Sequence, residues 1–422
     1  MDATYYLLFI SHMEHMEENV NIVIIGGGAS GLMAAITATK NHANVTVLEH
    51  TNKPGKKILM TGNGRCNLTN ERMESDNLPA YFHGDETLIS SVIGQFDNQD
   101  TKEFFTSLGL LLSDRAGYLY PRSMQASSVL WVLLEECARQ HVKVKNECHV
   151  EQINPIRNGQ GGFHIIADGR TIEADKLILS CGSKAYPVTG SDGSGYELLK
   201  QLGIKTTAIC PALCGLKVNA PWCKKASGVR AHATIRLSIK GQKDVEDTGE
   251  IQFTDYGISG IPVFQVSRFA SIALQQRKQV LGFLDLFPEY TKRELLTILD
   301  GKMQTHPEQS MKQQLIGLIP EKLIPVVIKD AKNKEEIAKH LKEFCFEIKG
   351  TNCFPMAQVA CGGVPASEID SKTLETKAVK NLYLTGELLD VDAICGGYNL
   401  QWAWSTGYVA AAHAANGFCK RK

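Results

Sequence analysis

The pattern of apolar positions near the N-terminus predicts a β-α-β unit. Residues 20–25 form a short run rich in β-branched side chains, which is typical of a strand. Beyond a glycine-rich turn, residues on one helical face recur at positions 32, 35, 36 and 39. Residues 44–48 are again strand-like and lead into Glu49, so the unit has the ~30 residues expected of a β-α-β fold.

The same kind of pattern continues further along the chain. Residues 125–140 have a helical apolar face, and strand-like stretches follow at 142–150, 163–167 and 176–181, with a turn marked by glycines between 159 and 162. Near the C-terminus, residues 381–385 predict a strand and residues 400–413 a helix. We expect this C-terminal segment to complete the first domain.

Between the N-terminal and C-terminal segments of the first domain, the pattern of apolar residues is different. From about residue 205 the chain has short alternating segments at 213–218, 233–239, 249–254 and 280–286, which favour an antiparallel sheet or small barrel. Thr291 and Glu294 then form a capping box, and helical patterns continue through 329–343. The expected domains are 13–193 with 355–422, a β-rich module at 194–288 with 344–354, a helical lobe at 289–343, and an extension at 1–12.

Composition narrows the functional class. A chain of 422 residues, 43% hydrophobic and 21% charged, is long enough for two or three globular domains. Lys plus Arg equals Asp plus Glu at 45 each, so no global field favours nucleic acid or a membrane surface. The 12 cysteines form no CxxC pair, which is typical of reduced thiols in the cytoplasm. The apolar run at 5–10 is too short for a signal peptide or a spanning helix.

The turn after the first strand has the spacing of a dinucleotide-binding site. Gly26 permits the tight turn, Gly28 lets the backbone approach a pyrophosphate, and Gly31 lets the helix pack on the strand. The helix N-terminus then offers N–H groups and its dipole to phosphate. Glu49 follows about twenty residues later, where a carboxylate accepts hydrogen bonds from ribose hydroxyls. A purely structural glycine turn is the competing interpretation.

The C-terminal segment favours FAD over NAD as the dinucleotide. The strand at 381–385 ends in Gly386 and Glu387, which suits an acid contacting the ribityl chain of a flavin. Residues 396–401, Gly-Gly-Tyr-Asn-Leu-Gln, then open a helix whose positive end would stabilise the N1/O2 edge of reduced flavin. Each segment alone could be an ordinary strand end or helix start.

Three segments together carry a specific resemblance. They are residues 24–35 around the glycine turn, residues 56–70 with Gly-Arg-Cys-Asn-Leu-Thr-Asn at 64–70, and residues 385–403. The chain resembles, over residues 20–415, the bacterial FAD-dependent oxidoreductases that include bile-acid ene reductases and aminoacetone oxidases. The resemblance implies an α/β, Rossmann-like FAD-binding domain of the glutathione-reductase kind, interrupted by a β-barrel-like module and a helical lobe.

The resemblance, together with the patterns above, assigns residues to the cofactor. They are Gly26, Gly28, Ser30, Gly31, Glu49, Lys57, Arg65, Cys66, Thr69, Val150, Gly182, Gly386, Glu387, Asp390, Gly397, Asn399, Leu400 and Gln401. Ser30 and Arg65 suit phosphate, whereas Cys66 and Val150 could equally be core residues. Ser183 stands where the family usually has a second glycine.

Tyr398, Tyr186 and Asp255 are the candidate proton donors. Asp255 replaces a histidine that the family typically carries in this segment, so the general acid or base is expected to differ. Aromatic packing is a competing interpretation for the tyrosines, and a solvated turn for Asp255. No His/Cys spacing fits a metal site, and Ser259 lacks the context of a hydrolase nucleophile.

These observations predict an FAD-dependent oxidoreductase that transfers hydride between flavin N5 and a small organic substrate, as an NAD(P)H-dependent reductase of an unsaturated or keto compound. Because only one dinucleotide turn is visible, NAD(P)H would bind transiently against the flavin as the electron donor. An amine or aminoketone oxidase using dioxygen, a non-catalytic flavin-binding redox sensor, and an NAD-dependent dehydrogenase without flavin are the alternatives. The substrate and the oligomeric state are left open by the sequence.

Overall fold

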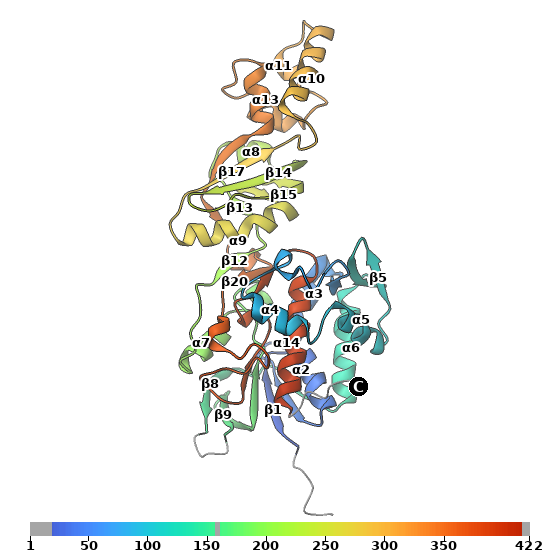
Figure 1. The fold of residues 1–422 in the computed structure, drawn as a ribbon, viewed down its shortest axis with the longest axis vertical. Helices are drawn as coiled ribbons and strands as arrows, with labels where there is room; N and C mark the ends of the chain where they lie inside the picture. The colour runs from blue at the N-terminus through green and yellow to red at the C-terminus, as the bar shows by residue number, and fades with distance from the viewer. Residues whose placement is uncertain (1–18, 157–160, 416–422) are drawn as a thin grey trace, which may run out of the picture.

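The computed structural model describes residues 19–156 and 161–415. An α/β part carries both ends of the described chain, an antiparallel sheet sits above it, and a helical lobe forms the opposite tip (Figure 1). The expected extension at 1–12, the outer limits of the first domain at 13 and 422, and part of the turn expected at 159–162 lie outside the described residues.

A five-stranded parallel sheet forms the centre of the α/β part. Its strands are β1 (Asn21–Ile25), β2 (Asn44–Leu48), β7 (Lys143–Lys145), β11 (Lys176–Leu179) and β21 (Leu382–Leu384), in the order β21-β11-β1-β2-β7. Ile24 of β1 lies between Val47 and Ile178. The sheet confirms the predicted β-α-β unit. It also confirms that the C-terminal strand, β21, joins the same sheet as β1.

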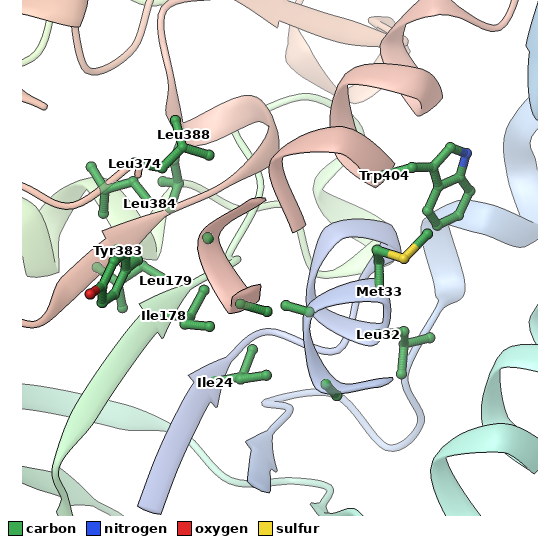
Figure 2. Close-up of a cluster of buried hydrophobic side chains, with 14 of the residues drawn as sticks. Ile24, Leu32, Met33, Ile178, Leu179, Leu374, Tyr383, Leu384, Leu388 and Trp404 are labelled. Atoms are coloured by element: carbon green, nitrogen blue, oxygen red, sulfur yellow. The ribbon is translucent and has the colours of Figure 1, made fainter. Parts of the chain in front are cut away.

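Helices cover this sheet and build the larger core. The main ones are α2 (Ala29–Lys40), α6 (Ala126–Arg139) and α14 (Tyr398–Ala414). Figure 2 shows Ile24, Ile178 and Leu384 on the strands to one side of α2, and Met33 on the other side of this helix, pointing toward Trp404 of α14. Helix α14 packs closely on α2 at Gly407. A Cβ atom at this position would lie only 2.4 Å from the Ser30 carbonyl oxygen, so only glycine fits there.

Smaller elements complete the α/β part. The strands are β3 (Thr69–Asn70), β4 (Phe82–His83), β5 (Leu112–Arg115), β6 (Tyr118–Pro121), β8 (Val150–Pro155), β9 (Phe163–Ala167), β10 (Arg170–Ala174) and β22 (Asp392–Ala393). The helices are α3 (Lys56–Met60), α4 (Glu86–Ile93), α5 (Asn98–Ser107) and α7 (Ser194–Gln201).

The strand predicted over 142–150 is wrong in its second half. β7 ends at Lys145, Glu147 adopts a left-handed conformation (φ +51°), and its N–H donates to Thr51 O at 3.0 Å. Val150 therefore begins β8, which pairs antiparallel with β9, rather than ending a strand. The two short strands share one apolar pattern, so sequence periodicity did not separate them.

A seven-stranded antiparallel sheet forms the middle of the molecule. Its strands are β13 (Leu216–Lys217), β14 (Arg230–Ile239), β15 (Val245–Phe253), β16 (Gly257–Ser259), β17 (Val280–Asp285), β18 (Phe344–Ile348) and β19 (Gly350–Thr351), in the order β18-β17-β14-β15-β16-β13-β19. The consecutive strands β18 and β19 pair with opposite edges, β17 and β13. One continuous segment thus joins both edges and curls the sheet into the barrel-like form expected.

Helices flank this sheet on two sides. α9 (Ile261–Gln275) lies between the sheet and the α/β part (Figure 1). The lobe contains α10 (Lys292–Thr305), α11 (Met311–Gln314), α12 (Ile324–Val327) and α13 (Lys334–Lys342), and the short α8 (Trp222–Ala226) lies by the sheet. The capping box predicted at Thr291 and Glu294 begins α10. Leu295, Leu299 and Leu341 join the sheet's own hydrophobic core, so lobe and sheet share one core.

Two chain crossings connect the halves of the molecule. β12 (Cys210–Ala212) leaves the α/β part and β20 (Val359–Cys361) returns to it, and the two pair antiparallel. Among the described residues, no helix is both long enough and apolar enough to span a bilayer.

Candidate functional site

The glycine turn between β1 and α2 leaves open space at one position only. A Cβ on Gly26 (φ +103°) would lie 2.4 Å from Ser180 O, and one on Gly31 would lie 1.9 Å from Gly26 O. At Gly28, the N-cap of α2, a Cβ would meet nothing within 4 Å. Gly26 and Gly31 are thus packed against other backbone atoms, whereas Gly28, at the N-terminus of α2, has open space beside it. This space fits a bound pyrophosphate.

Glu49 sits beside this turn with its carboxylate already engaged. Its Oε2 accepts the Gly27 N–H at 2.9 Å, and its Oε1 accepts the Thr51 N–H at 2.7 Å. The side chain is buried. A carboxylate has about four lone-pair positions, so Glu49 can fix the turn and still accept from a ribose hydroxyl.

Lys57, Ser183 and Glu387 meet although they are far apart in the sequence. The Lys57 ammonium lies 2.6 Å from Glu387 Oε2, and Ser183 Oγ donates to the same oxygen at 2.9 Å. Ser183 thus has a clear role where the family has glycine: it holds the Glu387 carboxylate. The ion pair keeps some exposure, 27% for Lys57 and 17% for Glu387, so a ligand can reach it.

The start of α14 is built on close backbone contacts. Gly397 (φ +95°) precedes the helix, and a Cβ there would lie 2.8 Å from Thr69 O. Asn70 Nδ2 donates to Gly396 O at 2.9 Å, while the Asn399 amide holds the Ala393 N–H and carbonyl at 2.9 and 2.8 Å. Asn399 therefore positions the segment before the helix. Leu400 follows on the first turn and is half-buried.

Several predicted cofactor residues are engaged inside the protein. Thr69 Oγ1 donates to Gln401 Oε1 at 2.6 Å, and both side chains are fully buried. Cys66 is also fully buried, and burial raises its thiol pKa to about 12, so it is a neutral core group. Gln401 and Thr69 therefore fix the position of α14 relative to β3.

The other predicted cofactor residues are spread over several segments, and among them Ser30 and Gly386 lie at the glycine turn. Ser30 Oγ accepts from Thr385 Oγ1 at 3.1 Å, beside Gly386 (φ +62°). Arg65 is exposed, with Nε donating to Gly62 O at 3.2 Å. Asp390 accepts a hydrogen bond from the Thr207 hydroxyl. Gly182 adopts a left-handed conformation (φ +70°), and the Val150 side chain is buried.

The three candidate proton donors lie on three different elements. Tyr398 is buried in α14 and stacks on Tyr81 with ring centroids 4.8 Å apart, and burial raises its pKa to about 12. Tyr186 is half-buried in a left-handed conformation (φ +61°), and its N–H donates to Phe354 O. Asp255 is exposed in the turn between β15 and β16. For Tyr398 and Asp255 these positions match the packing and solvated-turn interpretations.

A pocket at the junction of the two halves was not predicted from the sequence. It has a volume of about 350 Å³ and is lined by His83, Val245, Glu246, Asp247, Gln265, Val266, Phe269 and Ile394. These residues come from β4, β15, α9 and the loop after β22. Only tertiary structure brings them together, so no local motif could have identified them.

A buried ion pair lies next to this pocket. Arg268 of α9 contacts Asp392 of β22 through two hydrogen bonds of 2.9 and 3.0 Å, and Asp392 is 2% exposed on its side chain. Burial raises the Asp392 pKa to about 6, against the opposing effect of Arg268. Asp392 ends the motif at 385–392, which is a signal that the sequence did contain.

The fold and the glycine turn define a Rossmann-like dinucleotide-binding domain, and the family and relatives of the chain make it a flavin-dependent oxidoreductase. The chain belongs to the HI0933-like family, whose Rossmann-domain pattern matches residues 20–413. This confirms the family resemblance seen in the sequence.

Two similar curated proteins have different named activities. The chain is 44% identical over 410 residues to the 3-dehydro-bile acid delta(4,6)-reductase of Clostridium scindens, with 93% of this chain and 98% of that protein covered. It is 26% identical over 407 residues to the ribosomal RNA dihydrouridine synthase of Escherichia coli K12, with 93% and 98% covered.

A solved structure shares the fold. The 3-ketosteroid-delta4-(5alpha)-dehydrogenase of Rhodococcus jostii RHA1, crystallised with 4-androstene-3,17-dione, superposes with a TM-score of 0.53 at 15% identity and covers 96% of this chain and 99% of its own.

Proposed function

We propose that this flavoenzyme is an ene reductase that uses NAD(P)H to reduce a carbon–carbon double bond conjugated to a ketone in a largely apolar substrate. The observation that carries the proposal is the 44% identity, across nearly the whole of both chains, to a protein named as a reductase of 3-dehydro-bile acids. The junction pocket is compatible with it, because four of its eight lining side chains are apolar and His83 and Gln265 lie among them.

The proposed FAD site uses the residues already described. Gly26, Gly28 and Gly31 would hold the pyrophosphate at the α2 N-terminus, and Glu49 the adenosine ribose. The Lys57–Glu387 pair and the α14 N-terminus would face the ribityl chain and flavin ring. When bound, FAD supplies the two-electron hydride chemistry. The protein would orient the substrate at the junction.

RNA is a less suitable substrate for this chain. Two relatives are named ribosomal RNA dihydrouridine synthases, at 26% and 29% identity. The pocket here carries the carboxylates of Glu246 and Asp247, which would repel a phosphodiester backbone, and the net charge of the chain is zero. A small ketone avoids this repulsion.

A substrate screen tests the proposal. Purified holoenzyme is mixed anaerobically with NADH or NADPH and a conjugated steroid ketone, with the saturated ketone as control, and products are identified by mass. We expect the conjugated ketone to gain one dihydrogen while the nicotinamide is consumed. Amine consumption with matching hydrogen peroxide in air would mark an oxidase instead. Flavin that no substrate oxidises or reduces would favour a redox sensor.

A further inference from the structure

The junction pocket joins the segment that leads into α14 to the face of α9. Ile394, at the pocket wall, lies two residues before the Gly396–Gly397 turn. Gln265 of α9 accepts the Cys395 N–H at 2.8 Å, and Arg268 holds Asp392 from the same helix. The pocket wall is thus fixed to the loop that leads into α14, the helix whose N-terminus we propose faces the flavin ring.

The lining of this pocket selects a substrate class. Val245, Val266, Phe269 and Ile394 offer an apolar surface for a hydrocarbon skeleton. Asp247 and Glu246 disfavour an anionic group at the same end. An uncharged apolar ring system fits the apolar side chains and avoids repulsion from the carboxylates.

His83 is the pocket residue suited to bind such an oxygen. Its ring packs edge-on against Phe269 with centroids 5.6 Å apart, and within the described ranges no protein group forms a hydrogen bond with the ring. Burial, and second the charge of Arg268, lower the His83 pKa to about 4. At neutral pH the imidazole is therefore uncharged and has one N–H to donate.

We propose that the substrate ketone binds in this pocket and that His83 donates a hydrogen bond to its carbonyl oxygen. When hydride from the reduced cofactor adds to the β-carbon of a conjugated ketone, the electron pair of the double bond moves toward that oxygen, and a proton from solvent water adds to the α-carbon and restores the ketone. A neutral donor at the oxygen stabilises the charge that develops, as uncharged histidines do in other enzymes. The inference rests on the proposed reductase function and adds a residue that touches the substrate.

The test compares His83→Phe, which keeps an aromatic ring but removes the donor, with His83→Gln, which keeps a neutral donor. His164→Phe, on β9 outside the pocket, is the matched control. The first readout is the infrared carbonyl band of a ¹³C-labelled conjugated steroid ketone bound to oxidised holoenzyme, which needs no turnover. The second is the kcat and KM of its reduction, with flavin content as a check on folding.

We expect the bound carbonyl band to move to lower frequency in the wild type and the His164→Phe protein, and to return toward its unbound position in His83→Phe. The kcat should fall on the order of 10²-fold in His83→Phe, with KM changed far less and partial recovery in His83→Gln. An unchanged band and kcat in His83→Phe would overturn the inference. If the band responds to His83 while no conjugated ketone is reduced, the contact stands and the reductase proposal fails.

Discussion

At the scale of single residues, the sequence predicts which positions require glycine, but it does not predict which side chains come into contact in the folded protein. Gly26 and Gly31 are required because a Cβ at either would overlap backbone atoms, and spacing alone indicated this. His83 could not be predicted, because its environment depends on α9 and on a loop more than three hundred residues away. The sequence could identify the family motifs but not the pocket.

The glycine turn gives a matched pair of substitutions. Gly28→Ala should leave the free energy of unfolding of the apoprotein nearly unchanged, since φ is −80° and the Cβ meets open space. It should weaken FAD binding at least about tenfold, roughly 1.4 kcal/mol, by occupying the phosphate position. Flavin fluorescence titration and urea unfolding measure the two effects.

Gly31→Ala should behave in the opposite way. Its Cβ would lie 1.9 Å from Gly26 O, so we expect a loss of at least about 2 kcal/mol in unfolding free energy even without FAD. If Gly28→Ala binds FAD as tightly as the wild type, the pyrophosphate does not lie at this turn.

At the scale of elements, strands with strong apolar runs were predicted well and boundaries less well. α14 begins at Tyr398, two residues before the predicted start, because Gly397 at positive φ ends the loop there. The helix predicted from 329 begins at Lys334, where Asn333 caps it by accepting the Glu336 N–H. Capping chemistry, more than apolar period, determines these starts.

The contact between α9 and β22 predicts a pH-dependent stability. Arg268→Met leaves the Asp392 carboxylate buried without its partner, so its folded pKa should rise above the present value of about 6. When the pKa of a carboxyl is higher in the folded than in the unfolded protein, the folded protein loses stability as the pH rises from the unfolded pKa to the folded pKa. The variant should therefore be destabilised by about 3–5 kcal/mol near pH 8 and by much less near pH 5.

Urea unfolding at both pH values checks this prediction. In Arg268→Met with Asp392→Asn the carboxylate is gone, so the difference between the two pH values attributable to this pair should disappear. An equal loss at both pH values in the single variant would show that Arg268 acts through packing instead.

At the scale of the whole molecule, the return of the C-terminal segment was predictable and the junction was not. Motifs at both ends of the chain required β21 and α14 to lie beside the glycine turn. Thr385, which follows β21, donates to Ser30 at 3.1 Å, and Gly407 of α14 packs against the Ser30 backbone. The α/β part and the barrel-like sheet have separate hydrophobic cores joined by β12 and β20. How those cores meet depends on surface contacts that carry no periodic signal.

Two separate cores predict an uneven response to FAD. A ligand that binds only the folded state adds about 4 kcal/mol at a thousand times its Kd. In hydrogen exchange, peptides covering α2 and α14 should gain protection with saturating FAD, while those covering β14 and α13 should change much less. AMP serves as the control ligand. Equal added protection in both groups would show that the two cores unfold as one unit.

The most direct test of the reductase account is a single turnover without oxygen. The bound flavin is reduced chemically, excess reductant is removed, and a conjugated steroid ketone is added while the flavin absorbance is followed. We predict that the oxidised flavin band returns, with one saturated ketone formed per flavin. A band that stays bleached with every conjugated ketone, and returns only when dioxygen is admitted and forms hydrogen peroxide, would contradict the account.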